Sequence, residues 1–186
     1  ATGFAMPIQG CYGRTVALAY TVDRVSGMIG RAEELATITT AAHDAQRRGS
    51  ALVIEGEPGI GKTTLLAAAA ELAGDNDFRV LSCAGVQSQA SVGYAGIHEL
   101  VHPILEHVEA LPAHQKAALL TAFGLAEGQS PPPLLAGVSL LGLIEEAAAE
   151  RPLLLLVDDA QWLDESSLHA VTFVGRRVSA ASVLLL

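Results

Sequence analysis

The chain has 186 residues, enough for one domain with a hydrophobic core, and 51% of its residues are hydrophobic although only 4% are aromatic. Its formal net charge of −9 argues against a large surface for binding nucleic acid. Two distant cysteines, Cys11 and Cys83, form no metal-binding or redox spacing and suit a reducing cytoplasm, and no apolar run is as long as a transmembrane helix.

The N-terminal part of the chain gives little indication of chemistry. We expect residues 1–24 to be a linker or to be foreign to the domain, which we place at 25–186. Residues 28–48 predict a helix, because two acidic side chains stand in its first turn and apolar side chains follow at helical spacing. The final run, 182–186, reads as the middle of an apolar strand, so we expect the domain to be incomplete and the chain to be a piece of a longer protein.

The most specific pattern lies between a short apolar strand, predicted over 51–54, and a helix predicted over 64–73. Residues 56–63 match G-x-x-x-x-G-K-[ST], the phosphate-binding loop or Walker A motif. Its three glycines allow positive φ and bring backbone N–H groups close to phosphate oxygens, while the helix that follows directs its free N–H groups at the anion. The residues that we expect to bind the nucleotide here are Gly56, Glu57, Pro58, Gly59, Ile60, Gly61, Lys62, Thr63 and Thr64.

After the phosphate-binding loop and its helix, predicted strands and helices alternate along the chain. The patterns predict strands over 78–84 and 153–157, helices over 94–108, 113–123, 134–150 and 165–178, and a last strand over 182–186. Pro103 interrupts or starts the first of these helices, because proline lacks a backbone N–H group. Strands that alternate with helices predict an α/β fold with a mostly parallel sheet flanked by helices, as in a P-loop NTPase.

A metal site is predicted where the phosphate-binding loop meets the carboxyl end of the strand over 153–157. In this interpretation Lys62 contacts the β- and γ-phosphates and is a candidate catalytic residue, and Thr63 offers its hydroxyl to Mg²⁺. Asp158 is the candidate second Mg²⁺ ligand, and Asp159 is the candidate catalytic residue that activates water. The alternative is that both acids only cap the next helix. We expect Trp162 to pack under the site.

A competing motif occurs at residues 98–102, which match H-E-x-x-H. On a helix this spacing places two imidazoles, here His98 and His102, on one face for Zn²⁺, with Glu99 as the base. Pro103 follows directly and would disturb the helix that must hold both ligands. The plainer interpretation is a partly buried helix with histidines at its polar edge.

Four stretches together resemble the ATPase domain of large LuxR-type transcriptional regulators of actinobacteria, which are MalT-like signal-transducing (STAND) ATPases related to AAA-type ATPases. These stretches are Ile29-Gly30-Arg31 with Glu34-Leu35, the phosphate-binding loop through Leu66, Gly93 to Leu100, and the run LLLLVDDAQWLD over 153–164. The resemblance covers roughly 25–186. It makes Asp158 part of the Walker B motif and makes H-E-x-x-H incidental.

The resemblance implies further properties. Ile29, Gly30 and Arg31 would line the base and ribose of ATP, and the last strand would lie between the phosphate-loop strand and the Asp158 strand. ATP with Mg²⁺ would be a switch ligand, ADP the product of slow hydrolysis, and self-association the response. DNA would be bound by a C-terminal helix-turn-helix domain that this sequence does not contain, and neither the sensor-1 residue nor the helical lid is present. No membrane contact is expected.

The resulting hypothesis is the ATP-dependent switch domain of a cytoplasmic transcriptional regulator, acting as a slow ATPase. Three alternatives stay open at this point. One is another AAA-type ATPase, of an origin-recognition-like or chaperone-like kind. Another is a zinc metallopeptidase at residues 98–102, and the third is a structural module that binds nothing. Intact Lys62, Thr63 and Asp158 argue against the third.

Overall fold

The computed structural model describes residues 31–186, so the predictions for residues 1–24, Ile29 and Gly30 lie outside the described part. The described chain forms α-helices and strands in the order α1 (Ala32–Ala45), β1 (Ser50–Ala51), α2 (Lys62–Asp75), β2 (Arg79–Ala84), α3 (Ala95–Val101), α4 (Ala113–Ala122), α5 (Pro133–Glu150), β3 (Leu153–Asp158), α6 (Glu165–Gly175) and β4 (Val183–Leu185). Short 3₁₀ helices are η2 (Gln87–Gln89), η3 (His102–Ala110), η4 (Ala160–Trp162) and η5 (Val178–Ala180). Across residues 31–186, none of the helices combines the length and the apolar character that crossing a membrane requires.

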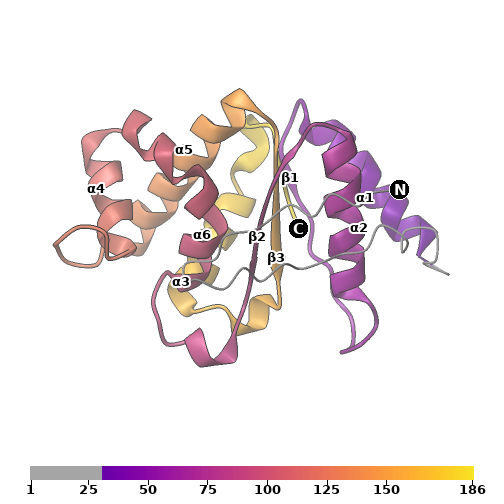
Figure 1. The fold of residues 1–186 in the computed structure, drawn as a ribbon, viewed down its shortest axis with the longest axis horizontal. Coiled ribbons are helices and arrows are strands. Elements are labelled where there is room, and N and C mark those ends of the chain that lie inside the picture. The colour runs from indigo at the N-terminus through magenta and orange to yellow at the C-terminus, as the bar shows by residue number, and fades with distance from the viewer. Residues whose placement is uncertain (1–30) are drawn as a thin grey trace, which may run out of the picture.

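The four strands form one parallel sheet in the order β1-β4-β3-β2 (Figure 1). The predicted α/β class is therefore confirmed. The position of β4 between β1 and β3 is also confirmed, since Leu184 is paired in register with both Ser50 and Leu154. A parallel arrangement places the carboxyl ends of all four strands at one edge of the sheet, where ligands of open α/β sheets bind.

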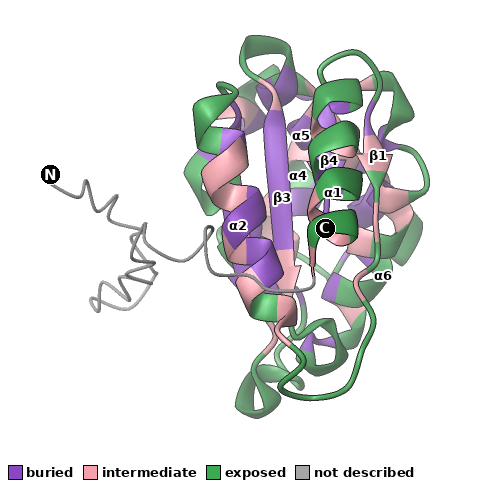
Figure 2. Cartoon of the chain, turned by 90° about the vertical axis from the view of Figure 1, so that its right-hand side faces the viewer, coloured by how far each residue is buried: buried purple, intermediate pink, exposed green. Residues whose placement is uncertain are grey.

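Helices cover both faces of the sheet, so the domain has three layers (Figure 1). Successive side chains of β3 point to opposite faces: Leu153 and Leu155 belong to the core beneath α3–α6, whereas Leu154 and Leu156 belong to the core beneath α1 and α2. Figure 2 shows β3 buried along most of its length and the outward face of α1 exposed. The uninterrupted leucines of this strand are explained by burial on both sides.

Two elements differ most from their predicted extents. The phosphate-loop strand, expected over 51–54, is β1 over Ser50–Ala51, and its pairing with β4 continues through the N–H group of Leu52, which donates to the carbonyl oxygen of Leu185. The helix expected over 94–108 is α3 followed by η3. The change to 3₁₀ geometry comes at His102-Pro103, where proline has no N–H group to donate to the preceding turn.

Candidate functional site

The loop between β1 and α2 has the backbone that its glycines predict, with one exception. Gly59 and Gly61 lie at φ 80° and 99°, a region that side chains with a Cβ rarely adopt. Gly56 does not have positive φ, so the expectation for that residue is wrong. Its lack of a side chain matters for a close contact instead, since a Cβ there would lie 2.9 Å from Cγ2 of Ile60.

Lys62 is the first residue of α2, and its side chain folds back across the loop. The Nζ atom donates hydrogen bonds to the carbonyl oxygens of Gly56 at 2.9 Å and Glu57 at 3.1 Å. Gly61, which precedes the helix in a left-handed conformation, has no side chain with which to cap it. The first N–H groups of α2 are therefore left for an external acceptor, at the end of the loop across which the Lys62 side chain lies.

The fold brings Thr63 and Asp158 together across 95 positions of sequence. Thr63 Oγ1 donates a hydrogen bond of 2.8 Å to Oδ2 of Asp158, the last residue of β3. The second carboxylate oxygen, Oδ1, accepts the N–H of Asp159 at 2.9 Å. A hydroxyl and a carboxylate oxygen in contact match the donors that Mg²⁺ takes from proteins, where it keeps several waters and uses one or two side-chain oxygens. The donor set therefore fits the predicted ion.

Asp159 leaves the strand in a left-handed conformation, at φ 47° and ψ 44°. Its side chain is exposed at the same edge of the sheet and accepts a hydrogen bond of 2.9 Å from Nε2 of Gln161. Trp162 does not pack under the site as expected: 41% of it is exposed, and Leu163 is the residue of this turn that is buried. The reason is geometric, because the 3₁₀ turn η4 places Trp162 on the outside.

Arg31 is the described member of the predicted base-and-ribose group, and it contacts the loop itself. Its Nη2 atom donates a hydrogen bond of 2.7 Å to the carbonyl oxygen of Ile60, and its Nη1 atom donates one of 2.8 Å to Glu34. The pKa of the Glu34 carboxyl is lowered by a hydrogen bond from the backbone N–H of Glu34 and by the hydrogen bond from the Arg31 side chain. Arg31 thus ties the start of α1 to the tip of the phosphate-binding loop.

The sequence analysis missed Asp164, which precedes α6 and is only 3% exposed. Its carboxylate accepts N–H groups from Tyr94 at 2.7 Å, Gly96 at 3.3 Å and Ser167 at 2.9 Å. One signal in the sequence was available, because an aspartate directly before a helical pattern is a preferred N-cap residue. The contacts to Tyr94 and Gly96 had no such signal.

The H-E-x-x-H residues are arranged as part of a packed helix. The rings of His98 and His102 are 5.7 Å apart and nearly perpendicular, and His98 also lies 5.0 Å from the ring of Phe123. Burial, and then the nearby His102, lower the pKa of His98, and burial raises the pKa of the Glu99 carboxyl. Within residues 31–186 no group of three or more His, Cys, Asp or Glu side chains is placed to hold a metal ion, so the zinc alternative gains no support.

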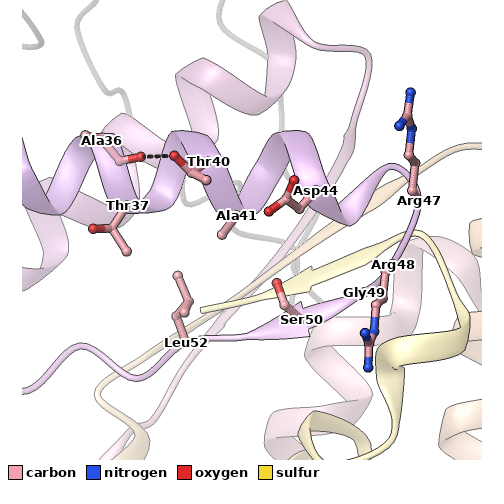
Figure 3. Close-up of a pocket in the computed structure, with 10 residues that line it drawn as sticks. All are labelled: Ala36, Thr37, Thr40, Ala41, Asp44, Arg47, Arg48, Gly49, Ser50 and Leu52. Carbon is pink, nitrogen blue, oxygen red and sulfur yellow. Dashed lines mark hydrogen bonds between the residues drawn. The ribbon is translucent and has the colours of Figure 1, made fainter.

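A hollow of about 800 Å³ lies elsewhere, between α1 and β1 (Figure 3). Its walls include Thr37 and Thr40 of α1, the turn with Arg47 and Arg48, and Leu52. It contains none of the predicted nucleotide-binding residues and is not part of the site described above. The loop before α2 and the segment after β2 instead extend from the opposite, lower end of the molecule in Figure 1.

Comparison with known proteins adds one finding to this geometry. No curated protein and no solved structure matches the chain. A family model described as the AAA ATPase domain matches residues 28–186. This range contains the phosphate-binding loop, the sheet and both acids at the end of β3. Because the match covers most of the sequence, the chain belongs to the AAA ATPase domain family, and its fold is that of a nucleotide-binding P-loop ATPase core.

Proposed function

We propose that residues 25–186 are the ATP-binding core of a LuxR-type transcriptional regulator, in which the nucleotide state controls activation of transcription. The observation that carries the nucleotide-binding part is the contact of 2.8 Å between Thr63 and Asp158. Two residues so far apart in sequence meet at the carboxyl edge of the sheet, directly beside Lys62 and the start of α2. This is where an open parallel sheet binds its ligand.

Each residue of the site has a role in this proposal. Magnesium-bound ATP supplies the transferable phosphoryl group and the divalent charge that neutralises it. Lys62 exchanges its bonds to loop carbonyls for phosphate oxygens, while Thr63 and Asp158 hold the metal ion. Asp159, exposed at the end of β3 and restrained by Gln161, orients water or takes its proton. Catalysis by these groups is positioning and charge stabilisation.

The regulatory part of the proposal has a separate basis. The stretch that narrows the resemblance to the regulator family starts at Gly93, and the run 153–164 is typical of P-loop ATPases with two adjacent acids. The two are far apart in sequence, yet Asp164 accepts hydrogen bonds from the backbone of Tyr94 and Gly96. A nucleotide-binding turn packed directly on the family-specific helix suits a switch. DNA binding is assigned to a C-terminal domain outside this chain, and self-association to the full-length cytoplasmic protein.

The test is titration of the purified chain with a fluorescent ATP analogue, with and without Mg²⁺. We expect Lys62→Ala to lose the binding, because the Lys62 ammonium group lies across the loop and is hydrogen-bonded to two of its carbonyl oxygens. Lys116→Ala is the matched control, since this lysine pairs with Glu109 and has no contact with the loop. Equal affinity of the wild type and Lys62→Ala would refute the assignment of the site.

A further inference from the structure

Asp164 has a buried carboxylate group, and both of its oxygens accept hydrogen bonds. Oδ1 accepts the N–H groups of Tyr94 and Ser167, and Oδ2 accepts the N–H group of Gly96. The residue is 3% exposed, and charged side chains are almost never buried to this extent without partners. The three donors come from two segments about 70 residues apart, so the carboxylate joins separate parts of the fold.

One carboxylate thus caps two helices. It is the N-cap of α6 through Ser167, and it also caps α3, whose own N-cap residue Tyr94 has φ 63° and no side-chain cap. Ser167 completes this arrangement, since its Oγ accepts the N–H group of Ile97 at 3.1 Å. The two helix ends lie so close that a Cβ at Gly96 would come within 2.4 Å of Leu163 Cδ2. The start of α3 is therefore fixed to the start of α6.

The segment from Asp158 to Asp164 is held at both of its ends. At its beginning, the N–H of Gly85 donates to the carbonyl oxygen of Asp158 at 2.9 Å. Between these ends the chain makes a tight turn in which the N–H of Trp162 donates to the carbonyl oxygen of Asp159 at 2.8 Å. At its end stands the buried Asp164. A short hydrogen-bonded turn therefore joins Asp164 to Asp158, which contacts Thr63.

We propose that Asp164 is a positioning residue for Asp158: by capping α3 and α6 together, it keeps the Asp158 carboxylate where it can share a Mg²⁺ ion with Thr63. The inference rests on the proposed nucleotide-binding function and adds to it a specific division of labour. Asp164 serves the Mg²⁺-dependent part of ATP affinity. The Mg²⁺-independent part of ATP affinity, which depends on Lys62 and the loop backbone, does not require Asp164.

The experiment measures the affinity for a fluorescent ATP analogue in excess EDTA and again in Mg²⁺, and takes the ratio as the Mg²⁺-dependent gain. We expect Asp164→Asn to reduce this gain by about fivefold or more, the affinity equivalent of one lost hydrogen bond. Affinity in EDTA should change by less than about twofold, since Lys62 is untouched. Asp164→Ser is the second variant. Serine is a good N-cap residue, so it should keep the cap of α6 and a folded chain. Its side chain is shorter and should lose the hydrogen bonds to the start of α3.

The control is Ser167→Ala, which removes a buried hydrogen bond to the same helix, α3, without changing Asp164. It should keep the full gain while thermal unfolding reports its loss of stability. Retention of the gain in a folded Asp164→Ser chain, or an equal loss of it in Ser167→Ala, would overturn the role of Asp164. Failure of the proposed function is a distinct result, namely no nucleotide binding by the folded wild type or binding that survives Lys62→Ala.

Discussion

Gly85→Ala is a sharp test of how the acidic end of β3 is held. Gly85 follows β2 and faces the backbone of the turn after β3. A Cβ at this position would lie 2.2 Å from the carbonyl oxygen of Asp159, 2.7 Å from the nitrogen of Leu163 and 2.8 Å from the carbonyl carbon of Trp162. All three are backbone atoms, so no rotation of a side chain relieves the contact.

The cost follows from these distances. The two segments must separate by about 1.2 Å to restore ordinary contact of 3.4 Å, and overpacking of this kind costs about 1–3 kcal/mol. The same movement weakens the hydrogen bond of 2.9 Å from Gly85 to Asp158, worth about 0.5–1.5 kcal/mol. We therefore expect the free energy of unfolding to fall by about 2–4 kcal/mol, which corresponds to a melting temperature about 6–12 °C lower for a domain of this size.

The assay is urea unfolding followed by circular dichroism, with the affinity for a Mg²⁺-bound ATP analogue measured on the same samples. Gly74→Ala is the matched control: it makes the same chemical change within α2, where a Cβ would meet nothing within 4 Å. Alanine should stabilise that helix by about 0.5–1 kcal/mol. An unfolding free energy for Gly85→Ala within about 0.5 kcal/mol of the wild type would refute the reasoning, because the clash would then be absorbed at no cost.

Two further predictions concern chemistry and pH. Asp159→Asn should slow ATP hydrolysis while leaving nucleotide affinity unchanged, because its side chain bonds Gln161 rather than Thr63 or the loop; equal turnover in a phosphate-release assay would remove its role as base. Burial, and then the nearby His102, lower the pKa of His98 below its ordinary value of 6.5. The stability contributed by the neutral imidazole is therefore complete above pH 6.5 and is lost as the pH falls through the lowered pKa of His98 in the folded chain. His98→Phe, which keeps an aromatic ring against Phe123, should therefore lose less unfolding free energy than the wild type between about pH 7 and pH 5, and parallel losses in urea titrations would contradict this.

The parts of the site that could be predicted from sequence are those set by local pattern and by sheet topology. The motif at residues 56–63 defines its own loop, because positive φ at Gly59 and Gly61 is needed for the turn whatever surrounds it. The meeting of Thr63 and Asp158 follows once the phosphate-binding loop and Asp158 are both assigned to the carboxyl ends of parallel strands, because Thr63 directly follows that loop. Neither inference needs to know how the helices pack.

What escaped prediction depends on contacts between distant segments. Gly56 was expected to need positive φ, but its constraint is the position of the Ile60 side chain. Trp162 was expected to pack under the site, but it is exposed and Leu163 is the buried residue of the 3₁₀ turn. The second role of Asp164 depends on where α3 begins, and no spacing along the chain contains that information.

The charge around the site explains why Mg²⁺ is the informative variable. Lys62 lies across the loop, and Arg31 contacts the loop while it pairs with Glu34. Asp158 and Asp159 lie at the end of β3, and Glu55 and Glu57 flank or belong to the loop. A triphosphate therefore enters a region whose side chains carry more negative than positive charge, in a chain of net charge −9. Only a divalent cation reverses that balance at short range, where salt does not screen it fully. Hence a substitution that displaces Asp158 should alter the Mg²⁺-dependent part of ATP affinity, whereas a substitution of Lys62 should alter ATP affinity both with and without Mg²⁺.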